Sequence, residues 1–266
     1  MLPFDQIRAF LLESSLFSWL LLCAMFLMIE IGWRVGRHFS LVYSQKKADT
    51  SDTFMAAIFG LLALLLAITF SGASDRFDKR RDLIAKEVST IGTAYQSIDL
   101  LAPENQPAVR DLFKKYLDSR IDIYSGSMAA DDLEKKFQTH NEIGNQLWRG
   151  LVNAVRATPY PEKLVAAQIL PEASDMFDAS ENQRLGLKFH PPPIIWQALI
   201  GLSLIGSLIA GYNLGLEQKR DWFLITIFTL LMAGTITIIL NLEFPRIGFI
   251  SLDEFDLELI SLRKSL

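Results

Sequence analysis

The sequence predicts an all-α, polytopic membrane protein with four transmembrane helices in two hairpins that flank a helical cytosolic domain. Two observations lead to this prediction. Four long apolar stretches come in two pairs, and the charged region between the pairs lacks the alternating pattern of strands. About 20 apolar residues cross the ~30 Å hydrocarbon layer of a bilayer as a helix. A helix also satisfies the backbone polar groups for which lipid offers no partner.

The ends of these stretches divide the chain into four parts. Residues 1–75 hold an N-terminal segment and the first hairpin, and residues 76–190 form the cytosolic domain. Residues 191–244 form the second hairpin, and residues 245–266 are a C-terminal tail. Half of the residues are hydrophobic and 21% are charged, which fits a chain shared between lipid and water.

The first predicted span is uncharged over residues 14–29, and Glu30 then interrupts it. We expect Glu30 to pair with Arg34, one helical turn further on. No cationic region precedes this stretch and no small-residue cleavage site follows it. The stretch is therefore predicted to be a retained span rather than a signal peptide.

The second predicted span, residues 53–74, has two distinct faces. Small residues recur along one face at steps of three and four: Ala56, Gly60, Ala63, Ala67, Ser71 and Ser74. Larger side chains occupy the opposite face: Ile58, Leu62, Leu65, Thr69 and, one turn beyond the span, Arg76. Small residues let neighbouring helices approach closely. The pattern indicates either tight packing alone, or a conduit lined by the larger face while the small face packs on neighbouring helices.

The third and fourth predicted spans, residues 191–216 and 222–242, carry no charge. The third repeats the small-residue stripe at every fourth position: Ser203, Ser207, Gly211 and Gly215. No ionisable residue lies near the middle of any span. Proton-coupled pumps usually need such groups, whereas a passive pore gated by an apolar constriction does not.

The cytosolic domain is predicted to contain only helices. Apolar residues at steps of three and four between Ile84 and Ile98 predict that the second span continues into the domain as one long helix. The last helix of the domain, over residues 162–184, is expected to kink near Pro171.

The polar residues of this domain form no catalytic pattern. Four carboxylates stand out as candidates: Glu142, Asp175, Asp178 and Glu181. No histidine spacing, phosphate loop or nucleophile elbow accompanies them, so we interpret them as a solvated helix face. His140 lies on the apolar side of its helix and is interpreted as a core or interface residue. We therefore expect no enzymatic activity.

The composition excludes further kinds of site. A net charge of −4 offers no basic surface for a nucleic acid. The single cysteine, Cys23, allows neither a disulfide framework nor a cysteine metal site, and the three histidines lack ligand spacing. We expect no metal and no cofactor.

Basic residues indicate the orientation. Two hairpins place both termini and the middle domain on one side of the membrane. Lys and Arg residues counted in the short loops alone would place the domain outside, whereas a count of all those near the spans places it in the cytoplasm, and the densest run is DRFDKRR at residues 75–81. We therefore expect both termini and the domain in the cytoplasm, with the spans in the inner membrane of a bacterium.

Three stretches resemble a known family. LAITFSGASDRFDKRR (66–81) is similar to the exit of the pore helix in bacterial bestrophins. EVSTIGTAY (87–95) and NLEFPRIG (241–248) resemble the bestrophin-like family of bacterial membrane proteins. The likeness covers about residues 54–252, and the order of hairpin, helical domain and hairpin is the same.

The chain departs from the bestrophin pattern in three places. The tyrosine between serine and aspartate is absent at Ser74-Asp75, and Phe77-Asp78 replaces a tandem tryptophan. The stretch after the last span contains Glu-Phe-Pro rather than Glu-Asp-Pro-Phe.

The resemblance implies an oligomeric, pentameric channel for small inorganic ions, with a neck lined by bulky residues of the second span. Matching residues 73–74 to the family motif implies neck positions at Leu61, Leu65 and Thr69. The helical pattern independently favours Leu65 and Thr69. Arg76 is expected at the inner mouth of the pore.

Two other functions stay open. A proton-conducting, stator-like subunit also has two hairpins around a helical domain. Its polar lining would come from the threonines of the fourth span: Thr226, Thr229, Thr235 and Thr237. A non-conducting scaffold or signalling protein would instead use the seam between Ile84 and Ile98 to bind a partner or a second copy. The acidic tail alternates with apolar residues over 252–259 and is interpreted as an amphipathic surface segment rather than a calcium loop.

Overall fold

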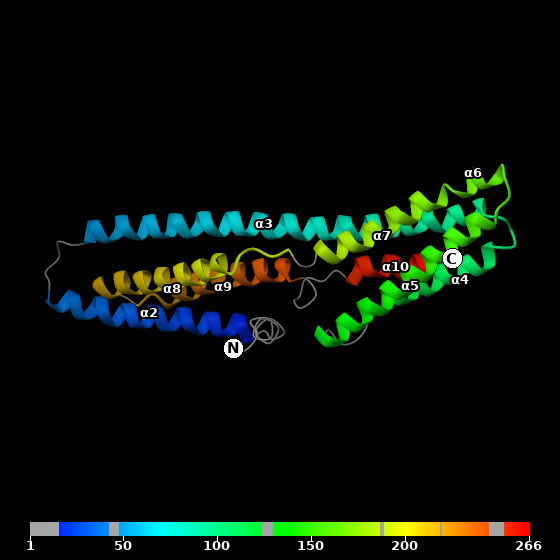
Figure 1. Cartoon of the computed structure of the whole chain (residues 1–266). Coiled ribbons are helices and arrows are strands. Elements are labelled where there is room, and N and C mark those ends of the chain that lie inside the picture. The colour runs from blue at the N-terminus through cyan, green and yellow to red at the C-terminus, as the bar shows by residue number, and fades with distance from the viewer. Residues whose placement is uncertain (1–15, 43–47, 124–129, 187–188, 219, 245–252) are drawn as a thin grey trace. The chain divides into compact units, whose positions relative to one another are not determined.

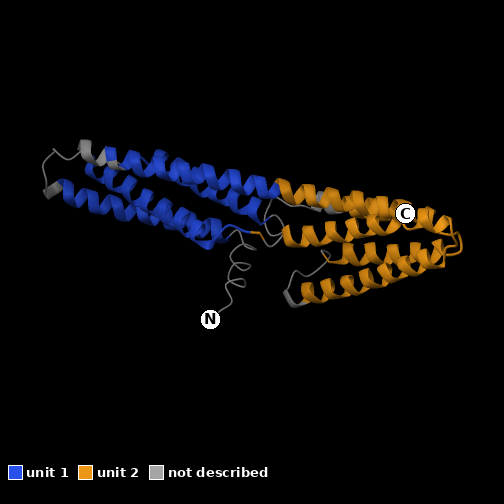
Figure 2. Ribbon diagram, turned by 45° about the horizontal axis from the view of Figure 1, so that its top comes forward, with its two compact units in different colours: residues 1–77, 190–251 blue, residues 78–189, 252–266 orange. Residues whose placement is uncertain are grey.

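The computed structural model describes residues 16–42, 48–123, 130–186, 189–218, 220–244 and 253–266. The chain divides into two compact units (Figure 2). The membrane unit comprises residues 1–77 and 190–251, and the helical domain comprises residues 78–189 and 252–266. The described residues form helices and contain no strand, which confirms the predicted all-α class.

Four helices of the structure are long and apolar enough to cross a bilayer. They are α2 (Leu16–Val42), α3 (Ala48–Gln96), α8 (Pro193–Leu216) and α9 (Trp222–Glu243), shown in Figure 1. The four predicted spans are thereby confirmed as helices. α3 runs on to Gln96 without a break, so the predicted continuation of the second span as one long helix is also confirmed.

α2 and α8 approach each other so closely that their backbones are in contact. A Cβ added to Gly32 would lie 2.0 Å from a backbone oxygen of α8, and one added to Gly211 would lie 2.1 Å from the Ile29 oxygen. The same arrangement recurs one turn further along, at Gly36 and Gly215. Each helix thus places glycines against the backbone of the other. The tight packing indicated by the small residues of the third span is confirmed.

α3 packs on the other spans through side chains instead. Leu62 is buried, and the Phe59 ring meets Phe228 edge-on with centroids 5.5 Å apart. The Asn213 amide lies 3.1 Å from the Met55 sulfur. Only 11% of the membrane window of α3 is buried within the chain, against 22–33% for the other three spans. α3 is therefore the span that its own chain covers least.

The described residues of the helical domain form the second part of α3, a short 3-10 turn (Ser97–Leu100) and five further helices. These are α4 (Gln106–Asp122), α5 (Ala130–Ala157), α6 (Glu162–Ala166), α7 (Ile169–Gly186) and α10 (Asp253–Ser265). Each of these elements contributes apolar side chains to the core of the domain. The core includes the fully buried Ile91, Phe113, Leu147 and Met176.

The expected single helix over residues 162–184 is two helices, which corrects the prediction of a kink near Pro171. α6 ends at Ala166 and α7 begins at Ile169. Proline lacks an N–H, and its ring collides with the carbonyl four residues earlier in a continuous helix. That carbonyl belongs to Ala167, where the helix is interrupted. The break therefore falls one turn before the proline.

The end of the chain packs on the helical domain. Leu259 of α10 is 2% exposed and belongs to the core of the domain. The Arg263 guanidinium binds both carboxylate oxygens of Asp118 at 2.7 and 3.0 Å, and the Tyr95 hydroxyl donates to the backbone oxygen of Leu266 at 3.1 Å. Of the apolar residues in the amphipathic segment predicted for the tail, Leu259 packs against the domain and Leu257 is 58% exposed.

A buried ion pair joins three helices of the domain. Arg120 of α4 donates to the two carboxylate oxygens of Glu87 in α3 at 2.5 and 2.8 Å. It also donates to the side-chain oxygen of Gln183 in α7 at 2.7 Å. All three side chains are buried. Burying an unpaired charge costs several kcal/mol, so this arrangement holds α3, α4 and α7 in one register.

We expect Gly211→Ala to destabilise the membrane unit by about 3 kcal/mol, because the new methyl group overlaps the backbone of α2. The Tm of the detergent-purified protein should fall by roughly 6–12 °C. Gly201→Ala is the matched control, since a Cβ at Gly201 of the same helix meets nothing within 4 Å. Equal Tm values for the two variants would contradict the backbone contact.

We expect Glu87→Gln to destabilise the helical domain by about 3–5 kcal/mol, because it leaves the Arg120 charge buried without its counter-ion. The double variant Glu87→Gln/Arg120→Met should be more stable than the sum of the two single changes implies. Thermal unfolding of the four proteins of this double-mutant cycle measures the coupling. Strict additivity would show that the two side chains do not act as a pair.

Candidate functional site

The side of α3 that its own chain leaves uncovered is the first candidate for function. It is called the exposed α3 face here and consists of Gly60, Leu61, Leu64, Ala67, Ile68 and Ser71. Leu61, Leu64 and Ile68 are 54%, 58% and 61% exposed. A Cβ at Gly60 would meet nothing within 4 Å. This face is uncharged and combines small residues with large apolar ones, so it suits contact with lipid, with another helix or with a narrow pore.

The predicted neck residues do not all lie on this face. Leu61 is exposed, Leu65 is half-buried and Thr69 is buried. Four residues make more than one turn of 3.6, so a row spaced by four drifts around the helix. The Thr69 hydroxyl donates to the backbone oxygens of Leu65 at 2.5 Å and Leu66 at 3.1 Å. A neck formed by Leu61, Leu65 and Thr69 stays a prediction.

Arg76, the fourth predicted pore residue, is held by a buried carboxylate at the end of α9. Its Nε donates to Glu243 at 2.8 Å, and His190 Nδ1 lies 2.9 Å from the other Glu243 oxygen. Glu243 is fully buried, whereas the Arg76 and His190 side chains are 29% and 24% exposed. The His190 ring stacks on Phe244 with centroids 4.7 Å apart. Glu243 therefore balances the charge of Arg76.

Reasoning from the sequence did not find this cluster. Arg76 and Glu243 are 167 positions apart, and no local spacing connects them. One signal was available: Glu243 closes an otherwise uncharged span, and a carboxylate at such a position needs a cationic or hydrogen-bonding partner. The sequence offers several basic residues near span ends, and only the fold selects among them.

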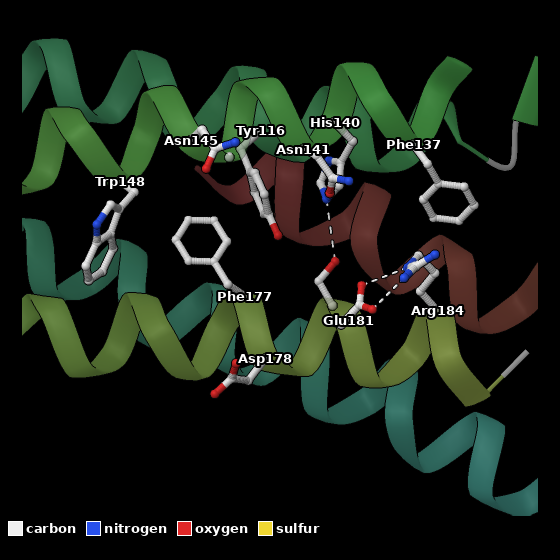
Figure 3. A pocket seen from close by; sticks show the side chains of 12 residues that line it. Tyr116, Phe137, His140, Asn141, Asn145, Trp148, Phe177, Asp178, Glu181 and Arg184 are labelled. Carbon is white, nitrogen blue, oxygen red and sulfur yellow. Dashed lines mark hydrogen bonds and ion pairs between the residues drawn. The ribbon is translucent and has the colours of Figure 1, made fainter. Parts of the chain in front are cut away.

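The helical domain contains a second candidate, a groove of about 510 Å³ between α4, α5 and α7 (Figure 3). Aromatic rings form much of its wall: Tyr116, Phe137, Trp148 and Phe177. The Phe177 ring meets Tyr116 edge-on at 5.5 Å and Trp148 at 6.3 Å. At one end, Arg184 binds both Glu181 oxygens at 2.6 and 2.7 Å. Aromatic walls with an ion pair at one end can accept an amphipathic side chain or small molecule.

His140 lies at the floor of this groove as a neutral core residue. It is buried, with Nδ1 2.8 Å from the Ser119 hydroxyl and Nε2 3.5 Å from the Ser180 hydroxyl. Burial, with a smaller contribution from the Arg120 charge, lowers the pKa of His140 to about 3. Its ring also packs on Tyr116, with centroids 4.5 Å apart. The prediction of a core or interface histidine is confirmed.

The four candidate carboxylates of the domain are all exposed: Glu142, Asp175, Asp178 and Glu181. This exposure agrees with their interpretation as a solvated face. Among the residues that the structure describes, no cluster of three or more His, Cys, Asp or Glu side chains could hold a metal ion.

We expect acid to destabilise the helical domain through His140. Its pKa returns to about 6.5 on unfolding, so the unfolded chain binds a proton that the folded chain excludes. Stability therefore falls as the pH drops below 6.5, by up to about 1.4 kcal/mol per pH unit. Between pH 7 and pH 5, the Tm of the wild type should fall more steeply than that of His140→Gln. His38→Gln, which changes an exposed histidine, should keep the wild-type slope. Identical slopes for wild type and His140→Gln would contradict a neutral, buried ring.

Comparison with known proteins agrees with this fold. The chain is similar in structure to a mutant of a bacterial bestrophin homologue from Klebsiella pneumoniae, with a TM-score of 0.57. The likeness covers 94% of this chain and 99% of that one at 15% sequence identity, so it shows the fold alone. No curated protein matches the chain. A Bestrophin-like domain matches residues 21–254, which is most of the sequence. The resemblance found in the sequence is thus confirmed, and the chain belongs to the Bestrophin-like family.

Proposed function

We propose that the protein is an oligomeric, bestrophin-like ion channel that passes small inorganic ions through a pore lined by α3. The observation that carries this proposal is the coverage of α3. It is the least covered of the four spans, and the side it turns away from its protomer is uncharged and rich in small residues.

If several copies surround one axis, the exposed α3 face of each copy packs against its neighbours and borders the pore. The small residues Gly60, Ala67 and Ser71 let neighbouring α3 helices approach each other closely. Leu61 and Ile68, beside them on the helix, then point toward the axis and narrow the pore. A ring of such apolar side chains gates ion passage by excluding water from the constriction. Leu61 belongs both to the exposed α3 face and to the neck row implied by the family resemblance.

Arg76 lies just beyond this constriction on the same helix, and its pair with Glu243 of α9 is at the proposed inner mouth. Because Glu243 balances Arg76, this mouth favours neither ion sign through that pair alone. We further propose a pentamer, by likeness to the bestrophins that the sequence resembles. The basic run at 75–81 supports a helical domain in the cytoplasm and spans in the inner membrane.

A stator-like subunit is less well supported, because three of the four threonines of α9 donate hydrogen bonds to their own helix. The hydroxyls of Thr229, Thr235 and Thr237 donate to backbone oxygens one turn earlier, at 2.5, 2.8 and 2.7 Å. A scaffold that binds partners through the seam from Ile84 to Ile98 is also less well supported. Both of these residues are buried in the core of the chain, so they offer no surface to a partner.

We expect the purified protein to conduct small ions in liposomes, and we expect charged adducts on the exposed α3 face to block this flux. In a Cys23→Ser background, Leu61→Cys and Ile68→Cys should lose flux about tenfold or more on reaction with a charged methanethiosulfonate, because a charge obstructs a narrow apolar constriction. Leu62→Cys is the control, since Leu62 is 1% exposed and faces the protomer.

The same scan tests the two levels of the proposal separately. Leu65→Cys and Thr69→Cys, tested in the same way, show which residues line the pore. Block at these two positions favours the neck row Leu61, Leu65 and Thr69, and block at Ile68 favours the exposed α3 face. If no adduct on α3 changes the ion flux, the proposal that α3 lines the pore is wrong, although the protein is still a channel. A protein that passes neither anions nor cations would overturn the channel itself.

A further inference from the structure

We propose that the groove between α2 and α9, at the hairpin-tip end of the membrane unit, binds an anionic phospholipid. The phosphate lies at Arg34 and Arg220, and an acyl chain lies along the apolar part of the groove. This site is independent of the pore proposed above. The groove has a volume of about 530 Å³.

The lining of the groove has the polarity of a phospholipid. Its deeper part is apolar and includes Cys23, Phe26, Leu27 and Ile225. Its other end carries charged and amphipathic side chains: Glu30, Trp33, Arg34, Arg220 and Trp222. From Cys23 to Arg34, α2 rises about 16 Å, which is about the depth of one leaflet of a ~30 Å hydrocarbon layer.

The charged side chains at the polar end of the groove have a net positive charge. Arg34 donates to Glu30 at 2.8 Å, which confirms the pair predicted from the sequence. Arg220 donates to both oxygens of the same carboxylate at 3.0 and 3.1 Å. Among the residues that line the groove, two guanidinium groups against one carboxylate give a net charge of plus one; the Asp221 carboxylate lies outside the lining and accepts from the Leu224 N–H as the cap of α9. The phosphodiester of a phospholipid such as phosphatidylglycerol carries one negative charge, and the Arg34 side chain, 74% exposed, keeps donors free to bind it.

Aromatic rings fix this positive end at the depth of the lipid headgroups. The Arg220 guanidinium lies 3.7 Å from the Trp33 ring centroid and 5.6 Å from that of Trp222. Cation–π contacts of this kind orient the guanidinium. Tryptophans at the ends of transmembrane helices mark the membrane–water interface, and basic pockets between such helices bind anionic headgroups.

The single cysteine of the chain supplies a site-specific reporter, because Cys23 is exposed in the apolar part of the groove. The experiment measures its alkylation by N-ethylmaleimide in detergent micelles with added phosphatidylglycerol or phosphatidylcholine. Phosphatidylglycerol should protect Cys23 from alkylation at a mole fraction about fivefold lower than phosphatidylcholine requires. This is the preference expected from one net positive charge near the headgroups.

Arg34→Gln should reduce this preference to about one, because the remaining Arg220–Glu30 pair has no net charge. Arg34→Lys, which keeps the charge, should retain the preference. Arg81→Gln is the control: it removes the same charge from the part of α3 that belongs to the other unit, outside the groove lining, and should keep the wild-type ratio. The Tm of each variant shows that it is folded.

Three outcomes would overturn the proposal. In the first, both lipids protect Cys23 equally in the wild type. In the second, the preference for phosphatidylglycerol survives in Arg34→Gln. In the third, inorganic phosphate without lipid protects Cys23 as well as phosphatidylglycerol does, which would identify a site for soluble anions instead.

Discussion

Backbone contact between α2 and α8 is the constraint on which the membrane unit depends. Apolar helices in lipid gain nothing from leaving water, so close packing decides which of them associate. Glycines on both helices remove the side chains that would hold the backbones apart. Ser203 and Ser207 of α8 fit the same seam, because their hydroxyls donate to carbonyls of their own helix at 2.8 Å. The contact is therefore close without leaving unsatisfied polar groups.

α3 takes no part in this backbone contact, and its buried residues follow a different spacing from the glycines of α2 and α8. Its buried positions recur at steps of three, four and seven: Leu62, Thr69, Ala73, Arg80, Ile84, Glu87 and Ile91. Each unit thus buries a stripe of the part of α3 that belongs to it. The opposite stripe is apolar and small in the membrane part, and it becomes charged from Asp75 onward. This change of polarity along α3 is the one expected where a helix passes from lipid to water.

Two buried carboxylates each balance an arginine from a distant part of the chain. Glu87 holds Arg120 in the helical domain, and Glu243 holds Arg76 in the membrane unit. Removal of either acid would leave a buried or half-buried cation, so these pairs specify one arrangement of the helices. His140 solves the same problem differently, because its burial keeps the ring neutral.

Features that depend on neighbours along the chain could be predicted from the sequence. Apolar runs of sufficient length identified the four spans, the three-and-four spacing identified the extension of α3, and a spacing of four identified the Glu30–Arg34 pair. Each follows from helix geometry, which relates only residues a few positions apart.

The tertiary structure decided what depends on residues brought together from far apart. It selected Glu243 for Arg76 and Glu87 for Arg120, and it showed which side of α3 its own protomer covers. The small stripe of α3 and that of α8 look alike in sequence, yet one is exposed and the other is in backbone contact with α2. Periodicity defines the faces of a helix, whereas only packing decides which face meets a partner, because many pairings of apolar helices satisfy the same local pattern.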